Sequence, residues 1–302
     1  MRLPAIVRLL RPHQWTKNLF VFAPLLFEQR FELAGRNLRV VAAFGIFCCL
    51  ASGIYVLNDV VDREADRLHP RKRARPVASG EIPVSVASMF ACALLAGGLA
   101  WAHLGLANWP LTAVCCAYVT VQAAYSFGLK RIAIVDVLCI SSGFVLRLLA
   151  GSTAAWVRPS EWILVCTIFV SLFLALCKRR HEVVTLGDDA AAHRTILADD
   201  PPALLDQLIG AAASATLVTY ALYTVDERTI RAHHLQWHGR EGPFLAATIP
   251  FVIFGVFRYL LLVYGREKGG SPTSTLLRDV PSLVNAALYL GAVLTIFRVF
   301  GA

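Results

Sequence analysis

Long blocks of apolar residues, almost free of charge, constrain the fold of this 302-residue chain more than any other feature. Blocks of about 18 or more such residues are typical of membrane-spanning helices. With 57% hydrophobic and 16% charged residues, the composition excludes an ordinary soluble domain. We predict an all-α, multi-pass transmembrane helical bundle in which residues 1–302 form a single domain. The sequence predicts about nine spans, at residues 15–33, 38–57, 83–104, 108–128, 134–155, 160–177, 204–225, 243–264 and 281–300.

The cysteines and histidines do not follow the spacing of a disulfide framework or a metal centre. All eight cysteines fall inside or at the ends of apolar blocks, and none forms a Cys-x-x-Cys pair. We interpret them as small, buried apolar residues. His233, His234 and His238 lie on a polar stretch without ordered acid or cysteine ligands, so we interpret that stretch as a loop.

The basic residues are unevenly distributed along the chain, whose formal net charge is +9. With a cytoplasmic N-terminus and nine spans, 19 of the 29 Lys and Arg lie on the cytoplasmic side and 8 on the other. This asymmetry follows the positive-inside rule, and it brings several polar segments together at the cytoplasmic face. The chain has no basic tail and no basic strand with interleaved aromatic residues, so no nucleic-acid partner is expected. The basic start lacks the pattern of a cleavable signal.

The strongest chemical motif is the run NDVVDREAD, residues 58–66, at the end of the second predicted span. At about 100° per residue, its oxygen-bearing residues share one helix face. Carboxylates stacked in this way repel each other, and a divalent cation relieves the repulsion. Magnesium suits such oxygen ligands and completes its shell with substrate phosphates. The predicted Mg²⁺ ligands are Asn58, Asp59, Asp62 and Asp66. The alternative is a solvated helix end that is paired with Arg63 and Arg67.

Basic residues near this motif are suited to a substrate that carries several phosphates. Each phosphate has a charge of roughly −1.5 to −2 near neutral pH; arginine binds it bidentately, whereas lysine acts as a point charge. The alternative for each cation alone is a membrane anchor. The predicted substrate-binding residues are Lys17, Asn18, Lys72, Arg73, Arg75, Lys130, Arg131, Arg147, Lys178 and Arg179.

Arg147 is unusual because it lies inside an apolar block, eleven residues after Asp136. On a helix the two residues point in nearly the same direction, and Arg147 lies roughly 16 Å into the membrane. A charge at that depth normally faces a cavity and has a partner. Gly143 and Gly151 would leave room beside the helix. Two interpretations stay open: a cation that lines a cavity for a substrate phosphate, or a buried structural ion pair.

These motifs resemble those of a known family. The acid run, followed by KRARPVASG at residues 72–80, resembles the first aspartate-rich motif of the UbiA intramembrane prenyltransferases. YSFGLKRIAIVD, residues 125–136, resembles the second family region. Together with RPHQWTKN at residues 11–18 and FRYLLLVY at 257–264, they are similar to the decaprenyl-phosphate phosphoribosyltransferases within that superfamily.

The resemblance implies a magnesium-dependent enzyme of the bacterial inner (cytoplasmic) membrane with a cytoplasmic active site. Such an enzyme moves a 5-phosphoribosyl group from phosphoribosyl pyrophosphate to a polyprenyl phosphate and releases pyrophosphate, for the synthesis of a cell-envelope arabinose donor. Membrane lipids are further partners, and self-association is left open. The residues implied in catalysis are Asp59, Asp62, Tyr125 and Asp136.

The second family region departs from the wider superfamily, in which many members that act on aromatic acceptors have a second acid pair. Here Asp136 stands beside Lys130 and Arg131, which favours a phosphoribosyl donor. The lipid phosphate is already anionic, so no strong base is needed. An aromatic prenyltransferase, the first alternative, would need a base to accept a proton. The second alternative is a transporter or non-catalytic lipid-binding protein, which inverted repeats and broken helices would indicate; the sequence indicates neither.

Overall fold

The structure is a computed structural model that describes residues 4–28, 34–70, 72–186, 201–237, 239–265 and 272–301. Its contacts separate the described residues into two compact units, one up to Arg158 and the other from Pro159 onward. Each unit is helical, and the strands described are confined to one short hairpin. The expectation of a single domain stays a prediction.

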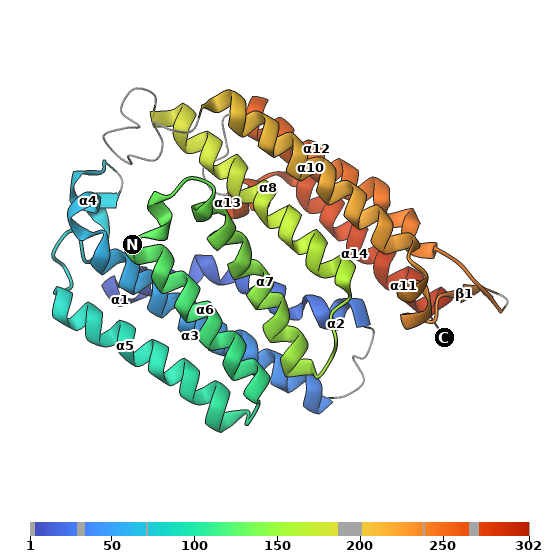
Figure 1. The fold of residues 1–302 in the computed structure, drawn as a ribbon, viewed down its shortest axis with the longest axis horizontal. Helices are drawn as coiled ribbons and strands as arrows, with labels where there is room; N and C mark the ends of the chain where they lie inside the picture. Colours follow the sequence, from blue (N-terminus) through green and yellow to red (C-terminus); the bar gives the residue numbers. More distant parts are fainter. Residues whose placement is uncertain are drawn as a thin grey trace. The chain divides into compact units, whose positions relative to one another are not determined.

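The first unit is built around four long helices, α3, α5, α6 and α7, which run alongside one another (Figure 1). The central helix α3 packs against α5, α6, α7 and η1. The elements of this unit are α1 (Ala5–Leu10), η1 (Pro12–Phe22), α2 (Ala23–Glu28), α3 (Ala34–Val61), α4 (Arg63–Leu68), η2 (Lys72–Ala74), α5 (Val84–Ala100), η3 (Trp101–Gly105), α6 (Trp109–Phe127), η4 (Leu129–Arg131) and α7 (Val135–Ala155).

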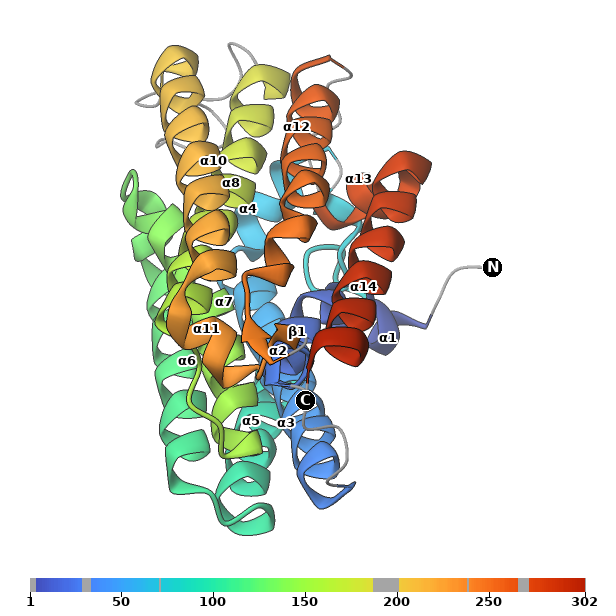
Figure 2. The ribbon, with the colours of Figure 1, turned by 90° about the vertical axis from the view of Figure 1, so that its right-hand side faces the viewer.

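The second unit is a group of four long helices, in which α8 packs along α10, and α12 packs against both α10 and α14 (Figure 2). Arg258 lies inside α12, and its partner is Asp279, which caps α14 and binds the guanidinium at 2.7 and 3.0 Å. The elements are α8 (Glu161–Leu186), α10 (Pro202–Val225), α11 (Glu227–Ala232), β1 (Gln236–Trp237), β2 (Arg240–Glu241), η7 (Phe244–Thr248), α12 (Ile249–Gly265), α13 (Pro272–Arg278) and α14 (Val280–Phe300).

Seven helices of the described residues are long and apolar enough to cross a membrane, which confirms the predicted class of an all-α membrane bundle. The number differs from the nine predicted spans. The segment 108–128 is helical as α6, with 19 residues, but hydroxyl side chains and Gln122 interrupt its apolar run. The other difference is the first predicted span.

The first predicted span, residues 15–33, is not one continuous helix. It begins in the 3-10 helix η1 and continues in α2, and its last residues, 29–33, lie outside the described ranges. A 3-10 helix of this length is uncommon because its hydrogen bonds are poorer than those of an α-helix. Tertiary contact explains it: a Cβ atom on Gly151 of α7 would lie 1.9 Å from the carbonyl oxygen of Val21. The backbone of η1 therefore touches α7 where α7 has no side chain.

Small residues and aromatic rings hold the helices of the first unit together. Ala51 of α3 and Ala91 of α5 are almost fully buried in the two packed helices, and such small residues allow helix backbones in a membrane to approach closely. The rings of Phe47 and Tyr118 meet at 5.0 Å and join α3 to α6.

The segment interpreted as a histidine-bearing loop is more ordered than expected. It contains the helix α11 and the β1–β2 hairpin. His233 is 8% exposed; its Nε2 lies 3.3 Å from the hydroxyl of Tyr223, and its ring lies 5.2 Å from that of Phe297. His238 lies outside the described residues. His233 is therefore a buried packing residue of the second unit.

We expect the stability of the protein to fall in mild acid because of His233. Burial lowers the pKa of His233 from 6.5 to about 4, so between these values the unfolded chain binds more protons than the folded one. This contribution to stability is complete above pH 6.5 and is lost as the pH falls toward 4. One pKa unit corresponds to about 1.4 kcal/mol, so the loss at pH 5 is roughly 2 kcal/mol.

Thermal unfolding of the purified protein at pH 7.5 and pH 5 measures this effect. His233→Gln keeps a polar side chain but cannot be protonated, so its melting temperature should depend less on pH than that of the wild type. Equal pH dependence of the two proteins would contradict the prediction.

Candidate active site

The acid motif lies where α3 passes into α4. The helix α3 ends at Val61, and Asp62 has φ −89° and ψ 6° at the N-terminus of α4. Backbone hydrogen bonds from Asp62 to Asn58, at 2.9 Å, and from Asp66 to Asp62, at 2.8 Å, continue the helical pattern across this junction. The side chains of the motif therefore stay close to the arrangement that a single helix would give.

Asp59 and Asp66 are brought together by one guanidinium group. Nη1 of Arg75 lies 3.1 Å from Oδ1 of Asp59 and 2.5 Å from Oδ2 of Asp66. Both carboxylates are almost fully buried, with 2% and 3% of their surfaces exposed. Oxygens of two acids from different turns thus point toward one position, which Arg75 reaches from the loop after α4.

A second cation, Arg11, also forms an ion pair with Asp59. It lies at the junction of α1 and η1 in the left-handed region, with φ 52° and ψ 57°, and its guanidinium lies over the Tyr55 ring at 5.4 Å. The junction is fixed to α3 because Ser52 Oγ donates to the Leu10 carbonyl at 2.9 Å. Burial lowers the pKa of Arg11 in spite of the neighbouring carboxylate.

Sequence analysis missed Arg11 as a member of the site and assigned it only to the cytoplasmic charge. Its position at the start of the RPHQWTKN motif was the one available signal. Arg11 and Asp59 are 48 residues apart, and no periodicity relates them.

Lys130 joins the second motif to the first. From η4 its Nζ forms an ion pair with Asp62 and donates to Oδ1 of Asn58 at 3.3 Å. Only 11% of the Lys130 side chain is exposed, whereas 27% of the Asp62 side chain is. Residues that are about 70 positions apart in the sequence therefore meet through one buried ammonium.

The other predicted site residues of the first unit differ in how deeply their side chains are buried. Tyr125 is half-buried near the end of α6, and Asp136 is 3% exposed in the first turn of α7, so both flank the turn that carries Lys130. Lys17 is half-buried in η1, and three cations are exposed; they are Lys72, Arg73 and Arg131.

Two predicted cations belong to the second unit. Lys178 and Arg179 lie on α8, where Lys178 pairs with Glu182 at 3.5 Å and Arg179 is 3% exposed. Their assignment to the substrate stays a prediction.

Known proteins share both the fold and the sequence of this chain. Residues 19–278 match the UbiA prenyltransferase family. The chain belongs to this family. It is 36% identical to a decaprenyl-phosphate phosphoribosyltransferase of Corynebacterium glutamicum over 91% of this chain and 81% of that protein. It is also 36% identical to the enzyme of the same name from Mycolicibacterium smegmatis, over 91% of this chain and 86% of that protein.

A solved structure has the same fold at lower sequence identity. A UbiA homologue from Archaeoglobus fulgidus, bound to GPP and Mg²⁺, superposes with a TM-score of 0.72 and 19% identity, and the match covers 98% of this chain and all of that one. Seven helices able to cross a membrane, in a chain of the UbiA family, show an integral membrane protein.

In this UbiA chain, Arg147 is held by neutral groups of the protein. It is 5% exposed. Nε donates to Asn18 at 2.7 Å, Nη1 to the Gly143 carbonyl at 2.8 Å and Nη2 to the Tyr118 hydroxyl at 2.9 Å. Asn18 is itself fully buried and donates to the Cys48 sulfur at 3.4 Å. Two residues predicted to bind substrate thus bind each other.

The room expected beside α7 is used by protein atoms. A Cβ atom on Gly143 would lie 2.8 Å from Gln122 Nε2 and 3.2 Å from Arg147 Nη1, and Val21 fills the space at Gly151. The contacts of Arg147 are those of a residue that fixes η1 and α6 to α7. The predicted role of Arg147 in binding a lipid phosphate stays a prediction.

Replacing Arg147 with methionine should destabilise the folded protein. The change would leave the side-chain oxygens of Asn18 and Tyr118 without their donor, and each buried unsatisfied group costs about 1–3 kcal/mol. Tyr118→Phe removes one hydrogen bond to the guanidinium and should cost less, about 1.5–3 kcal/mol. Thermal unfolding in the same detergent compares the two variants. A methionine variant as stable as the wild type would contradict this role.

Proposed function

We propose that this chain is a magnesium-dependent transferase that moves a 5-phosphoribosyl group from phosphoribosyl pyrophosphate to a polyprenyl phosphate and releases pyrophosphate. The observation that carries the proposal is the meeting of Arg11, Arg75 and Lys130 with the buried acid motif. A pyrophosphate held by a metal, next to further phosphates, needs acids and cations in the same place. The names of the C. glutamicum and M. smegmatis relatives support this choice of substrates.

The residues of the site are suited to magnesium. Asp59 and Asp66 offer carboxylate oxygens near a common point, and magnesium is usually held by one or two carboxylates together with substrate phosphates and water. The described residues contain no group of three or more His, Cys, Asp or Glu that could hold a metal without such help. Asn58 and Asp62, both bound to Lys130, are the other proposed ligands. When bound, magnesium would supply positive charge that stabilises the leaving pyrophosphate.

The chain's own residues would act by binding and orientation. Arg75 and Lys130 would hold phosphate oxygens of the donor, so that charge is neutralised as the bond from the ribosyl C1 to pyrophosphate breaks. An oxygen of the lipid phosphate forms the new bond to C1, and because it is already anionic no proton has to be removed. Tyr125 or Asp136 would orient the ribose hydroxyls while C1 gains oxocarbenium character.

The proposed site faces the cytoplasm of a bacterium from its inner membrane. The excess of Lys and Arg around the acid motif supports this orientation. Phosphoribosyl pyrophosphate is a highly charged, water-soluble donor, and a site at the membrane surface allows it to meet a lipid acceptor.

Incubation of the purified protein with polyprenyl phosphate, phosphoribosyl pyrophosphate and magnesium tests the proposal. Mass analysis of the lipid should show the added 5-phosphoribosyl group, and the product should require all three components. An aromatic prenyltransferase is the competing function, because the chain belongs to a family named for prenyl transfer. Turnover of a prenyl pyrophosphate with an aromatic acceptor, and none of phosphoribosyl pyrophosphate, would replace the proposal with that alternative.

A further inference from the structure

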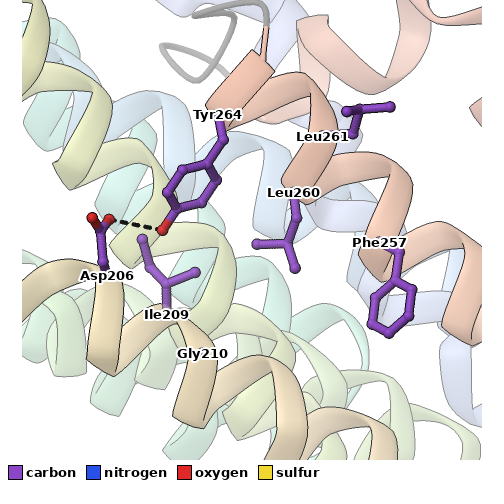
Figure 3. Close-up of a pocket in the computed structure, with 7 residues that line it drawn as sticks. All are labelled: Asp206, Ile209, Gly210, Phe257, Leu260, Leu261 and Tyr264. Atoms are coloured by element: carbon purple, nitrogen blue, oxygen red, sulfur yellow. Dashed lines mark hydrogen bonds between the residues drawn. The ribbon is translucent and has the colours of Figure 1, made fainter.

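The second unit contains a groove that the proposed reaction does not use. It has a volume of about 500 Å³ and lies between α10 and α12. It is lined by Asp206, Ile209, Gly210, Phe257, Leu260, Leu261 and Tyr264 (Figure 3). Both helices are able to span a membrane, so a groove between them is accessible to molecules of the membrane.

The walls of the groove are apolar along most of its length. Phe257 and Leu261 of α12 are 57% and 55% exposed, and Leu260 points toward α10 in Figure 3. From Phe257 to Tyr264 the helix rises by roughly 10 Å. A Cβ atom on Gly210 would have no atom within 4 Å. The missing side chain leaves an open notch in the α10 wall, which a hydrocarbon chain can fill.

One end of the groove is polar, because Asp206 and Tyr264 line it and Arg180 lies beside both of them. Asp206 lies near the start of α10, and Tyr264 lies in the last turn of α12. Oδ1 of Asp206 accepts from the Tyr264 hydroxyl at 2.7 Å and from Nε of Arg180 at 2.5 Å. The Arg180 guanidinium lies over the Tyr264 ring at 4.0 Å. The polar cluster is therefore at the membrane-surface end of these antiparallel helices.

Both charged groups of the cluster have atoms that can form further hydrogen bonds. The two bonds end on Oδ1 of Asp206, whose side chain is 39% exposed, and within the described part of the chain Oδ2 accepts no hydrogen bond. Arg180 uses Nε, and its two terminal nitrogens donate no hydrogen bond to the residues that the structure describes. A carboxylate oxygen that lines the end of the groove and the guanidinium group beside it, whose side chain is 18% exposed, therefore offer opposite charges next to each other.

We propose that the groove binds one phospholipid whose head group carries a primary ammonium. Its ammonium binds Asp206, its phosphate binds Arg180, and one of its hydrocarbon chains lies along Gly210 and Phe257. A quaternary ammonium head cannot donate a hydrogen bond to the Asp206 carboxylate. A head group with negative charge alone, including a polyprenyl phosphate, meets Asp206 without a compensating cation of its own. The pairing of opposite charges therefore favours the zwitterionic lipid with hydrogen-bond donors.

Native mass spectrometry of the full chain tests the site. The delipidated protein is incubated separately with dioleoyl phosphatidylethanolamine, phosphatidylcholine and phosphatidylglycerol, and bound lipids are counted. We expect one tightly held ethanolamine lipid. Gly210→Leu places a side chain in the notch, where a Cβ atom meets nothing within 4 Å, and should weaken lipid binding by about tenfold or more. Gly291→Leu is the matched control, because Gly291 of α14 also has open space beside it, and it should bind lipid as the wild type does.

Asp206→Asn tests the contact with the lipid head group separately from the contact with the hydrocarbon chain. This variant should still bind one lipid but should no longer prefer ethanolamine to choline, and thermal unfolding shows whether it is folded. Equal retention of lipid by Gly210→Leu and the wild type would overturn the proposed groove. Equal binding of the three lipids by the wild type would overturn the proposed head group. Displacement of the phospholipid by polyprenyl phosphate would assign the groove to the acceptor and overturn the proposal.

Discussion

Asp62→Asn should lower transferase turnover by about a hundredfold to a thousandfold, because it removes a carboxylate that is proposed to hold the magnesium ion of the donor pyrophosphate. The side chain keeps its shape, and 27% of it is exposed beside Lys130, so the folded protein should tolerate the change. Turnover measured at saturating magnesium and donor checks the effect. Thermal unfolding of the same preparation checks that the variant is folded.

Glu64→Gln is the matched control for this experiment. Glu64 belongs to the same acid run, but its side chain is 75% exposed and pairs with Arg63 and Arg67 at the surface. The turnover of the Glu64→Gln variant should equal that of the wild type. Asp59→Asn should lower turnover to a similar extent, but it leaves two half-buried guanidinium groups with a weaker partner and should lower the melting temperature as well. Full activity of Asp62→Asn, or of the wild type in excess chelator, would disprove the proposed role of the metal.

Arg75→Ala and Lys130→Ala should each weaken the binding of phosphoribosyl pyrophosphate by roughly tenfold to a hundredfold. Hydrogen bonds to charged groups contribute about 1.5–3 kcal/mol, and about 1.4 kcal/mol corresponds to a factor of ten in affinity. The affinity for polyprenyl phosphate should change less, because both cations lie on the acids that are proposed to hold the donor. Isothermal titration with each ligand separately measures the difference.

Arg63→Ala provides the control for a general loss of positive charge. Arg63 lies in the same segment, and among the residues that the structure describes its ion pair is with Glu64, at 3.6 Å, so donor affinity should change little. Because Arg75→Ala leaves Asp59 and Asp66 facing each other, Arg75→Gln, which retains a hydrogen-bond donor, serves as a second variant. Donor binding that is unchanged in Lys130→Ala and in both Arg75 variants would contradict the proposed phosphate contacts.

The sequence by itself determined the class of fold and the helix face that the acid motif shares. Apolar blocks of helical length have few alternatives in a membrane, where every backbone polar group must be satisfied within the segment. This is why helices lie at seven of the predicted spans and why α6 is helical although its sequence is more polar. The acid face was predictable for a similar reason: the positions of Asn58, Asp59 and Asp62 follow from the turn angle of one helix, and no distant residue is needed to relate them.

Only the tertiary structure decided which cations meet those acids. The ion pair of Arg11 with Asp59 and that of Lys130 with Asp62 join residues that are 48 and 68 positions apart in the sequence. Whether residues so far apart in the sequence meet depends on how the helices pack. The same holds for η1. Its sequence predicts a span, but contact of the Val21 carbonyl with Gly151 and the bond from Arg147 to Asn18, 129 residues away, hold it in a 3-10 conformation. Periodicity relates residues within a helix; contacts between helices depend on side-chain shape and on the polar groups that each helix must satisfy.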